Sequence, residues 1–365
     1  MQIAIEKMKD SELKPLFTDA ASLGFGKIFT DYMFTMHYYP DSGWVEPKIS
    51  PYSPFVIDPA SVVLHYSQEI FEGLKAYAAP DGRILLFRPE QNAKRMYSSA
   101  LRMCMVPFPE ENFLEGIKTL VNLEKRWIPK APGTSLYIRP ALVGLGAALG
   151  VHPAPEYLFF IILTPVAAYF KGGFNPVSLY VEDYYVRAAL GGVGNAKTGG
   201  NYAASLMAAA KAEEKGFSQV LWLDARERKY VEEVGAMNIF FVFGDKLVTP
   251  GLSGSILPGI TRMSVIELAK NMGYNVEERQ ISIEEVINGL NSGEITEAFG
   301  SGTAAVISPV GSLQYKEKNY LVSNNRVGKV TQELYNRLVN IQYGLAPDPF
   351  GWVKDIGRLD TPIPG

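Results

Sequence analysis

The sequence contains very little cysteine and histidine. Cys104 is the one cysteine among 365 residues, so no disulfide can form within the chain. The three histidines, His37, His65 and His152, are far apart along the chain, and none has the spacing to a cysteine that is typical of zinc sites. We therefore expect neither a disulfide framework nor a metal centre.

Long apolar runs and an excess of one charge are also missing. No stretch is apolar over the length that a transmembrane helix needs, and the opening segment MQIAIEKMKDSELK is rich in acids and lacks the apolar core of a signal peptide. Lys and Arg number 35 against 38 Asp and Glu, a net charge of −3, which gives no field that would attract nucleic acid or an anionic membrane. We expect a cytoplasmic protein that binds neither nucleic acid nor membrane.

What the sequence does contain is enough apolar material for large cores. Hydrophobic residues make up 47% and aromatic residues 12%, and 365 residues correspond to about two domains. Strand-like and helical runs do not alternate regularly, which favours an α+β fold over one alternating sheet. Gly172, Gly173 and Pro176 interrupt two strand-like runs. We therefore expect a small N-terminal α/β domain over residues 1–166, a linker over 167–177 and a larger C-terminal domain over 178–365.

Three segments give specific local predictions. The segment SVVLHYSQEIFEGLKAYA, residues 61–78, predicts a strand followed by a helix. The segment NYAASLMAAAKAEEKG, residues 201–216, predicts a helix that ends at its glycine, with Ala203, Leu206, Met207 and Ala210 on one face. The residues SIEE at 282–285 form a capping box, which predicts the start of another helix.

The segment GGVGNAKTGGNY, residues 191–202, places a single lysine among glycines. It allows three interpretations: a phosphate-binding P-loop, a lysine that forms a Schiff base with a cofactor, or a mobile surface loop. A Walker A loop requires glycine directly before its lysine, but Ala196 occupies that position, and Gly199 and Gly200 interrupt the start of the following helix. These departures disfavour a nucleotide-binding protein without excluding it.

A Schiff-base lysine would need a particular set of partners. Pyridoxal phosphate requires a lysine that can be neutral, an acid near its pyridine nitrogen, a donor to its 3′-oxygen and a cup of backbone amides for its phosphate. Lys197, Glu233 and Tyr202 could fill the first three roles. The segments LPGITR (257–262) and GSGTAA (300–305) could supply the amides. Taken alone, Glu233 and its neighbour Glu232 could equally be a solvated strand edge.

Nine segments in one order resemble the branched-chain-amino-acid aminotransferases, which are pyridoxal-phosphate enzymes of fold type IV and the class IV aminotransferase family. They cover roughly residues 25–345 and are FTDYM, HYSQEIFEGLKAY, FRPEQNAKRM, GTSLYIRP, GGVGNAKTGGNY, QVLWLD, EEVGAMNIFFV, LPGITR and FGSGTAAVI. The resemblance implies a two-domain fold with the cofactor between the domains, and a homodimer in which a residue near Tyr66 of the partner subunit approaches the pocket.

The resemblance also implies roles for individual residues. Lys197 would carry the cofactor and move the proton, and Tyr202 and Glu233 would bind the ring. The remaining cofactor-binding residues would be Arg95, Arg187, Ile260, Thr261 and Thr303. The substrate-binding residues would be Tyr66, Phe71, Tyr137, Arg139, Tyr169, Thr303 and Ala304, with Arg139 meeting the side-chain carboxylate of glutamate.

The implied reaction is a ping-pong amino transfer from L-leucine, L-isoleucine or L-valine to 2-oxoglutarate, giving branched-chain 2-oxo acids and L-glutamate. Three alternatives stay open. One is another type IV enzyme, a D-amino acid aminotransferase or an aminodeoxychorismate lyase. The second is a nucleotide-binding protein that uses Lys197 in a P-loop, and the third is a binding protein without catalysis.

Overall fold

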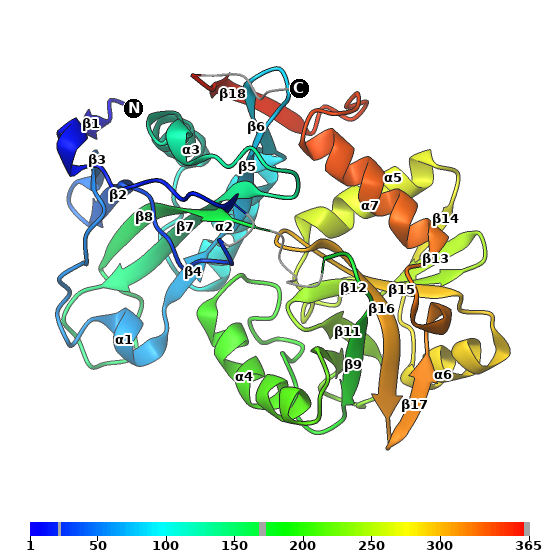
Figure 1. Cartoon of the computed structure of the whole chain (residues 1–365). Helices are drawn as coiled ribbons and strands as arrows, with labels where there is room; N and C mark the ends of the chain where they lie inside the picture. The colour runs from blue at the N-terminus through cyan, green and yellow to red at the C-terminus, as the bar shows by residue number, and fades with distance from the viewer. Residues whose placement is uncertain (21–22, 168–172, 361–365) are drawn as a thin grey trace. The chain divides into compact units, whose positions relative to one another are not determined.

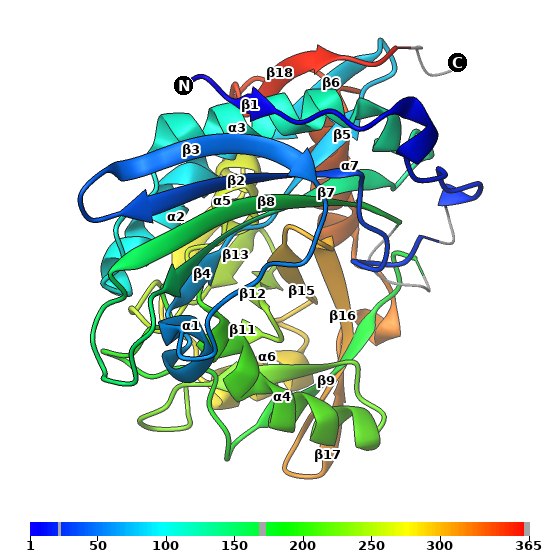
Figure 2. The ribbon, with the colours of Figure 1, turned by 90° about the vertical axis from the view of Figure 1, so that its left-hand side faces the viewer.

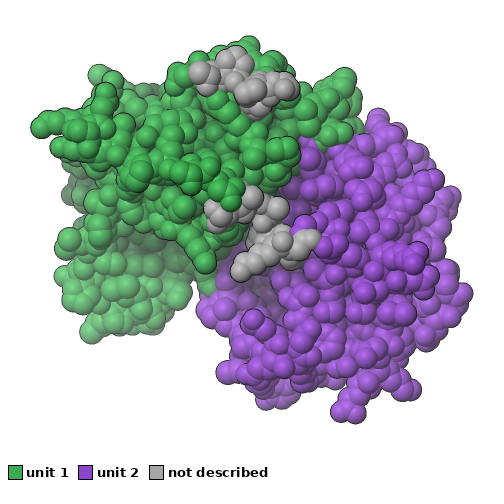
Figure 3. Space-filling model, viewed as in Figure 1, with its two compact units in different colours: residues 1–171, 196–199, 340–365 green, residues 172–195, 200–339 purple. Residues whose placement is uncertain are grey.

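The computed structural model describes residues 1–20, 23–167 and 173–360 (Figure 1). The chain divides into two compact units, coloured separately in Figure 3. Unit 1 comprises Met1–Lys171, Ala196–Gly199 and Asn340–Gly365, and unit 2 comprises Gly172–Asn195 and Gly200–Val339.

The first boundary between the units falls inside the expected linker at 167–177. The rest of the division differs from the expected partition at residue 178, because two later segments belong to unit 1. The segment Ala196–Gly199 carries Lys197, which the sequence analysis assigned to the C-terminal domain. The segment Asn340–Gly365 joins unit 1 because its strand β18 (Val353–Arg358) pairs with a strand of the first sheet.

Unit 1 is built on a nine-stranded, mostly antiparallel sheet in the order β1-β3-β2-β8-β7-β5-β6-β18, with β4 paired to β7. Figure 2 shows β3, β2, β8 and β7 lying side by side. The strands besides β18 are β1 Ala4–Ile5, β2 Tyr32–Tyr39, β3 Gly43–Pro51, β4 Glu69–Phe71, β5 Leu74–Ala78, β6 Arg83–Phe87, β7 Ser135–Leu145 and β8 Glu156–Val166.

Two amphipathic helices cover one face of this sheet, α2 (Pro89–Arg102) and α3 (Glu110–Leu123). Their apolar residues, including Ala93, Ile117 and Leu120, join a continuous core with the inward-facing residues of the strands. The shorter helical segments of unit 1 are η1 Asp10–Glu12, α1 Val62–Tyr66 and η3 Lys125–Trp127.

The prediction for residues 61–78 was wrong. The structure has the helix first, as α1, and the strands β4 and β5 afterwards. Residues Leu74–Ala78 are all buried between neighbouring strands, and a short buried run has no periodicity that separates a strand from a helix.

Unit 2 contains a second nine-stranded sheet, which mixes parallel and antiparallel pairs in the order β11-β10-β9-β16-β15-β12-β13-β14, with β17 paired to β16. The strands are β9 Val177–Glu182, β10 Gln219–Leu223, β11 Val231–Val234, β12 Met237–Phe243, β13 Lys246–Thr249, β14 Asn275–Glu278, β15 Glu297–Gly302, β16 Val306–Tyr315 and β17 Lys318–Leu321.

The helical segments are α4 Gly199–Glu214, α5 Ile260–Asn271, α6 Ile283–Ser292, η4 Ser323–Asn325 and α7 Lys329–Gln342. The capping prediction at residue 282 is confirmed, since Oγ of Ser282 accepts a hydrogen bond from the backbone N–H of Glu285, 3.0 Å away, at the start of α6. Across the part of the chain that the structure describes, none of the helices combines the length and apolarity that crossing a bilayer requires.

The predicted apolar face of α4 was wrong. The helix is where the sequence placed it, but Leu206 and Met207 are 67% and 56% exposed. The buried positions are Asn201, Ala208 and Ala212, and the two alanines pack with residues of β10. The small alanine side chains let the helix lie close to the sheet, and the larger residues of the other face are left outside.

Candidate functional site

Lys197 is held on unit 1 by backbone contacts from two elements. Its N–H donates to Oγ of Ser99 on α2 over 3.0 Å, and its carbonyl accepts a hydrogen bond from the N–H of Phe71 on β4, also over 3.0 Å. Two residues later, the N–H of Gly199 donates to a carboxylate oxygen of Glu69. The glycine-rich segment is therefore fastened at the lysine, which does not fit the interpretation of a mobile surface loop.

The lysine amine lies in a partly dry and partly cationic environment. Its Nζ lies 4.8 Å from the centroid of the Phe71 ring. Burial and the nearby Arg95 guanidinium lower the pKa of Lys197 to about 8, against an opposing contribution from the Glu72 carboxylate. A lysine with this pKa carries a substantial neutral fraction near neutral pH, which a nucleophilic amine requires.

Arg95 forms a buried, bidentate ion pair with Glu72. Its Nε lies 2.7 Å from Oε1 and its Nη2 lies 2.8 Å from Oε2 of the same carboxylate. Burial alone would raise the pKa of Glu72, but Arg95 outweighs it and holds that pKa below its usual range. Asn92 adds a hydrogen bond of 2.7 Å to Oε2. The pair fixes the guanidinium of Arg95 close enough to influence Lys197.

Aromatic residues and a further arginine lie beside the Lys197 segment in unit 1. The guanidinium of Arg139 lies 4.7 Å from the Phe71 ring centroid, and its Nη2 donates to the Tyr137 hydroxyl over 3.1 Å. Tyr137 is buried, and Gly73 leaves room for its hydroxyl, because a Cβ at Gly73 would lie 2.0 Å from that oxygen. These contacts bring Phe71, Tyr137 and Arg139 together with Lys197.

Among the described residues, no contact joins the expected substrate residue Tyr66 to this cluster. The Tyr66 hydroxyl donates to the backbone carbonyl of Leu149, and Tyr66 is 37% exposed. Tyr169 lies outside the residues that the structure describes.

Unit 2 contains a buried carboxylate with fixed partners. Glu233 is 2% exposed on β11, so the alternative of a solvated strand edge is excluded for it. Nε of Arg187 lies 2.5 Å from its Oε2, and the side-chain amide of Asn238 donates to its Oε1 over 3.1 Å. The structure thus pairs Arg187 with the acid, and an adjacent guanidinium favours the ionised carboxylate.

The backbone amides predicted to form an anion cup are at the ends of elements in the same unit. Ile260 and Thr261 are the first two residues of α5, whose N-cap Gly259 provides no side-chain hydrogen bond. An uncapped helix N-terminus presents free N–H groups to an anion. Thr303 and Ala304 form the turn between β15 and β16, and Tyr202 is in the first turn of α4.

Sequence reasoning missed several residues that hold these groups in place. Glu72 follows Phe71 in the segment HYSQEIFEGLKAY. Only its buried ion pair with Arg95 shows that it holds that guanidinium in place. Asn238 lies within the segment EEVGAMNIFFV. Its side-chain amide donates over 3.0 Å to the backbone carbonyl of Leu257, which is 19 residues later in the sequence. Ser99 carries no motif at all.

The comparisons with known proteins all match this chain to aminotransferases. The family model for amino-transferase class IV matches residues 69–313. The chain belongs to the class IV aminotransferases. A probable branched-chain-amino-acid aminotransferase of Staphylococcus epidermidis is 53% identical over 98% of this chain and 99% of its own length. Branched-chain-amino-acid aminotransferase 2 of Bacillus subtilis is 51% identical over 98% of each chain.

The solved structures of relatives show the same fold. The branched-chain amino acid aminotransferase of Escherichia coli has a TM-score of 0.74 at 27% identity, covering 90% of this chain and 99% of that one. A branched-chain amino acid aminotransferase from T.th., solved with pyridoxamine 5'-phosphate, has a TM-score of 0.74 at 28% identity, covering 89% and 98%. The predicted fold type IV, the resemblance to branched-chain-amino-acid aminotransferases and the transaminase activity are confirmed. A class IV aminotransferase uses pyridoxal phosphate, which disfavours the nucleotide-binding and non-catalytic alternatives.

Proposed function

We propose that this class IV aminotransferase transfers the amino group of L-leucine, L-isoleucine or L-valine to 2-oxoglutarate in a ping-pong reaction. The observation that carries the proposal is the set of contacts around Lys197. An amine with a pKa of about 8 lies against the Phe71 ring, with Tyr137 and Arg139 beside it. The names of the relatives at 51–53% identity support the choice of branched-chain substrates.

The residues present fit pyridoxal phosphate as the cofactor. Lys197 offers a desolvated amine, Glu233 offers a buried carboxylate, and the start of α5 offers backbone N–H groups at an N-terminus that no side chain caps. When bound, pyridoxal phosphate supplies an aldehyde that reacts with amines and a protonated ring that draws electrons from the substrate Cα–H bond.

Each of the chain's own residues would have a separate role beside the cofactor. Lys197 would hold the cofactor at rest and would accept the Cα proton of the substrate on its amine. Glu233 would accept a hydrogen bond from the ring N–H, and Tyr202 would donate one to the ring 3′-oxygen. The phosphate would be held by Arg95, Ile260, Thr261 and Thr303. Arg187 supports Glu233 by pairing with its second oxygen.

One binding region has to accept both an alkyl chain and a second carboxylate. Phe71, Tyr137, Tyr66 and Tyr169 would provide the apolar wall, and burial of a branched alkyl group against such rings contributes about 25 cal/mol per Å². Arg139 would meet the side-chain carboxylate of 2-oxoglutarate. Its guanidinium carbon lies 4.7 Å from the centroid of the Phe71 ring and 5.4 Å from that of the Tyr137 ring, so the charge is held at the apolar wall. Backbone amides of Thr303 and Ala304 would receive the α-carboxylate.

The experiment compares amino donors on the purified holoenzyme. With 2-oxoglutarate as acceptor, L-leucine, L-isoleucine and L-valine should each yield glutamate, and D-alanine should yield none. Lys197→Ala should lose both this activity and the visible absorbance of the bound cofactor. Turnover of D-alanine with no turnover of L-leucine would reject the substrate assignment and leave the fold assignment intact.

We also propose that the protein is a cytoplasmic homodimer, as the family resemblance implies. Sedimentation or light scattering of the holoenzyme at several concentrations tests the dimer directly.

A further inference from the structure

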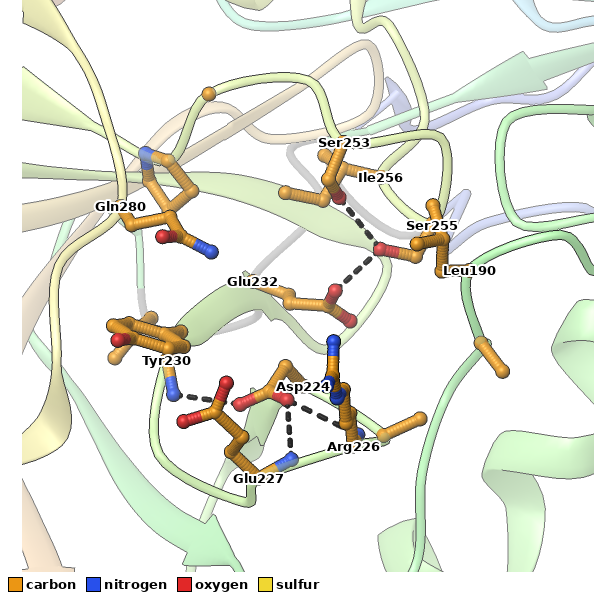
Figure 4. A pocket seen from close by; sticks show the side chains of 15 residues that line it. Leu190, Asp224, Arg226, Glu227, Tyr230, Glu232, Ser253, Ser255, Ile256 and Gln280 are labelled. Carbon is orange, nitrogen blue, oxygen red and sulfur yellow. Dashed lines mark hydrogen bonds between the residues drawn. The ribbon is translucent and has the colours of Figure 1, made fainter.

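A cavity of about 450 Å³ opens in unit 2 beside the strand β11 (Figure 4). It is lined by Ala189 and Leu190, by residues between Asp224 and Glu232, by residues between Pro250 and Ile256, and by Gln280. Glu232 and Glu233 are consecutive on β11, so their side chains point to opposite faces of the strand. The cavity therefore lies on the face away from the carboxylate assigned to the cofactor, and it contains none of the residues assigned to cofactor or substrate.

Glu232 projects into this cavity as a buried carboxylate. It is 7% exposed, and one of its oxygens accepts a hydrogen bond from Oγ of Ser255, which lies 2.8 Å from Oγ of Ser253. Figure 4 shows this chain of three side chains. Within the described residues, no ion pair reaches Glu232 and its other oxygen has no hydrogen-bond donor. Burial, reinforced by the charge of Asp224, raises the pKa of Glu232, and a cation placed beside the carboxylate would offset this by favouring its ionised form.

The other charged groups of the cavity are arranged differently. The Asp224 carboxylate is occupied, because it accepts the backbone N–H groups of Arg226, Glu227, Lys229 and Tyr230. It shapes the loop and has no oxygen left for a strong contact with a ligand. The Arg226 guanidinium is exposed at the cavity, and the described residues include no ion-pair partner for it.

Apolar side chains complete the lining. Leu190 is 77% exposed at the cavity, although a leucine gains by leaving water, and the buried Ile256 is also part of the lining. A ligand with an alkyl group would cover Leu190. The cavity thus combines a buried anion with one vacant oxygen, an exposed cation and an apolar surface.

We propose that this cavity binds a small α-amino acid with an apolar side chain. Its ammonium group lies against Glu232 and Ser255, its carboxylate against Arg226, and its side chain against Leu190 and Ile256. A volume of about 450 Å³ is within the usual range for small-molecule sites. No covalent step is involved.

The bound amino acid would act on the catalytic residues through Ser255, a part of the proposal that rests on the proposed function. The backbone carbonyl of Ser255 accepts a hydrogen bond of 3.0 Å from Nη1 of Arg187, and Arg187 pairs with Glu233. An ammonium group beside Glu232 adds positive charge behind Arg187. Because that charge weakens the capacity of Glu233 to hold a protonated ring, occupancy of the cavity should lower kcat.

The binding experiment uses L-α-methylleucine, which has a methyl group in place of the Cα hydrogen and therefore cannot be transaminated. Titration calorimetry is carried out on holoenzyme that has been treated with borohydride, so that the cofactor is fixed on the protein. We expect one binding site per chain in the wild type. Glu232→Gln keeps the size of the side chain and removes its charge, and should weaken binding by about tenfold or more. Arg226→Gln, at an exposed position that cannot disturb the core, should weaken it by at least about threefold.

Glu227→Gln is the matched control, because Glu227 also lines the cavity but is exposed at its loop. Its affinity should stay within about twofold of the wild type. Absence of binding to the wild type, equal affinity in Glu232→Gln, or an equal loss in Glu227→Gln would each overturn the site. These outcomes do not depend on turnover, so they are separate from failure of the proposed function.

A single-turnover experiment then tests the coupling without L-leucine, which could itself occupy the cavity. The pyridoxamine form of the enzyme is mixed with 2-oxoglutarate alone, and α-methylleucine should lower the maximal rate of the wild type by about fivefold and leave that of Glu232→Gln unchanged. A competitor at the substrate site would be displaced by saturating 2-oxoglutarate. An unchanged maximal rate in the wild type would overturn the coupling.

Discussion

Nε of Arg187 lies 2.5 Å from Oε2 of Glu233, and both side chains are buried. A buried carboxylate with a guanidinium on one oxygen and the amide of Asn238 on the other is fixed in position. It can therefore accept a hydrogen bond from a protonated heterocycle without reorganising, which is the condition under which such a contact contributes most to catalysis.

Glu233→Gln should lower kcat for L-leucine by about a hundredfold or more, because the neutral amide no longer stabilises positive charge on the cofactor ring. The measurement is a single-turnover absorbance assay of the half-reaction with L-leucine alone. An unchanged single-turnover rate would contradict the role of Glu233. Since the substitution leaves Arg187 without its carboxylate, urea unfolding should be measured in parallel to show that the variant is folded under the assay conditions. Glu227→Gln, at an exposed position, serves as the control.

The pKa of Lys197 predicts how the rate of cofactor attachment to the cofactor-free protein depends on pH. The amine is protonated and unreactive below its pKa of about 8, and becomes neutral as the pH rises through that value. The rate at which visible absorbance develops on adding pyridoxal phosphate should therefore rise with a midpoint near pH 8. Glu72→Gln should move this midpoint to lower pH, because the Glu72 carboxylate raises the pKa of Lys197. A midpoint near 10.5, the ordinary value for lysine, would show that the amine is exposed to water.

Gly73 should be needed for the position of Tyr137. A methyl group at residue 73 would lie 2.0 Å from the Tyr137 hydroxyl and 2.9 Å from the ring carbon that bears it, so the ring must move. We expect Gly73→Ala to reduce kcat/KM for L-leucine by about tenfold, equivalent to about 1.4 kcal/mol of overpacking.

Gly150→Ala is the matched control for that variant, since its new Cβ would meet no atom closer than 3.4 Å. If both variants have the activity of the wild type, Tyr137 does not contribute to the substrate wall in the way proposed.

A buried acid far from Lys197 in the sequence should make stability depend on pH. Glu124 is 1% exposed and accepts a hydrogen bond of 2.5 Å from the N–H of Tyr32, and burial raises its pKa to about 7. Its ordinary value is 4.5, so the folded protein holds a proton that the unfolded chain releases. The associated stability is complete below about pH 4.5 and is lost as the pH rises through about 7, an effect of about 3 kcal/mol.

Urea unfolding of the wild type and Glu124→Gln between pH 5 and pH 8 tests this directly. The free energy of unfolding of the variant, relative to the wild type, should increase with pH over that range, because glutamine does not titrate. A constant difference between the two proteins would mean that Glu124 is ionised throughout.

Part of the fold and of the candidate site could be predicted from the sequence because it depends on local chemistry. The lysine among glycines, the LPGITR segment and the capping box are contiguous, and each specifies a turn or a helix start through its own backbone. The same holds for the helices α2, α3 and α4, whose composition and periodicity indicate a helix wherever they pack. The family resemblance added roles to single residues such as Arg95, which by pattern alone could be a surface arginine.

The sequence by itself therefore determined the class of enzyme and most element types, and it is the source of the proposal that Lys197 is the reactive lysine. Only the tertiary structure decided which face of α4 is buried, that Glu233 is a buried and paired acid, and that the Lys197 segment belongs to unit 1 through Ser99 and Phe71. The physical reason is that burial and pairing depend on which strands and helices meet across the chain. A lysine 98 residues from its serine partner, or an acid paired with an arginine from a separate loop, carries no local signal of that contact.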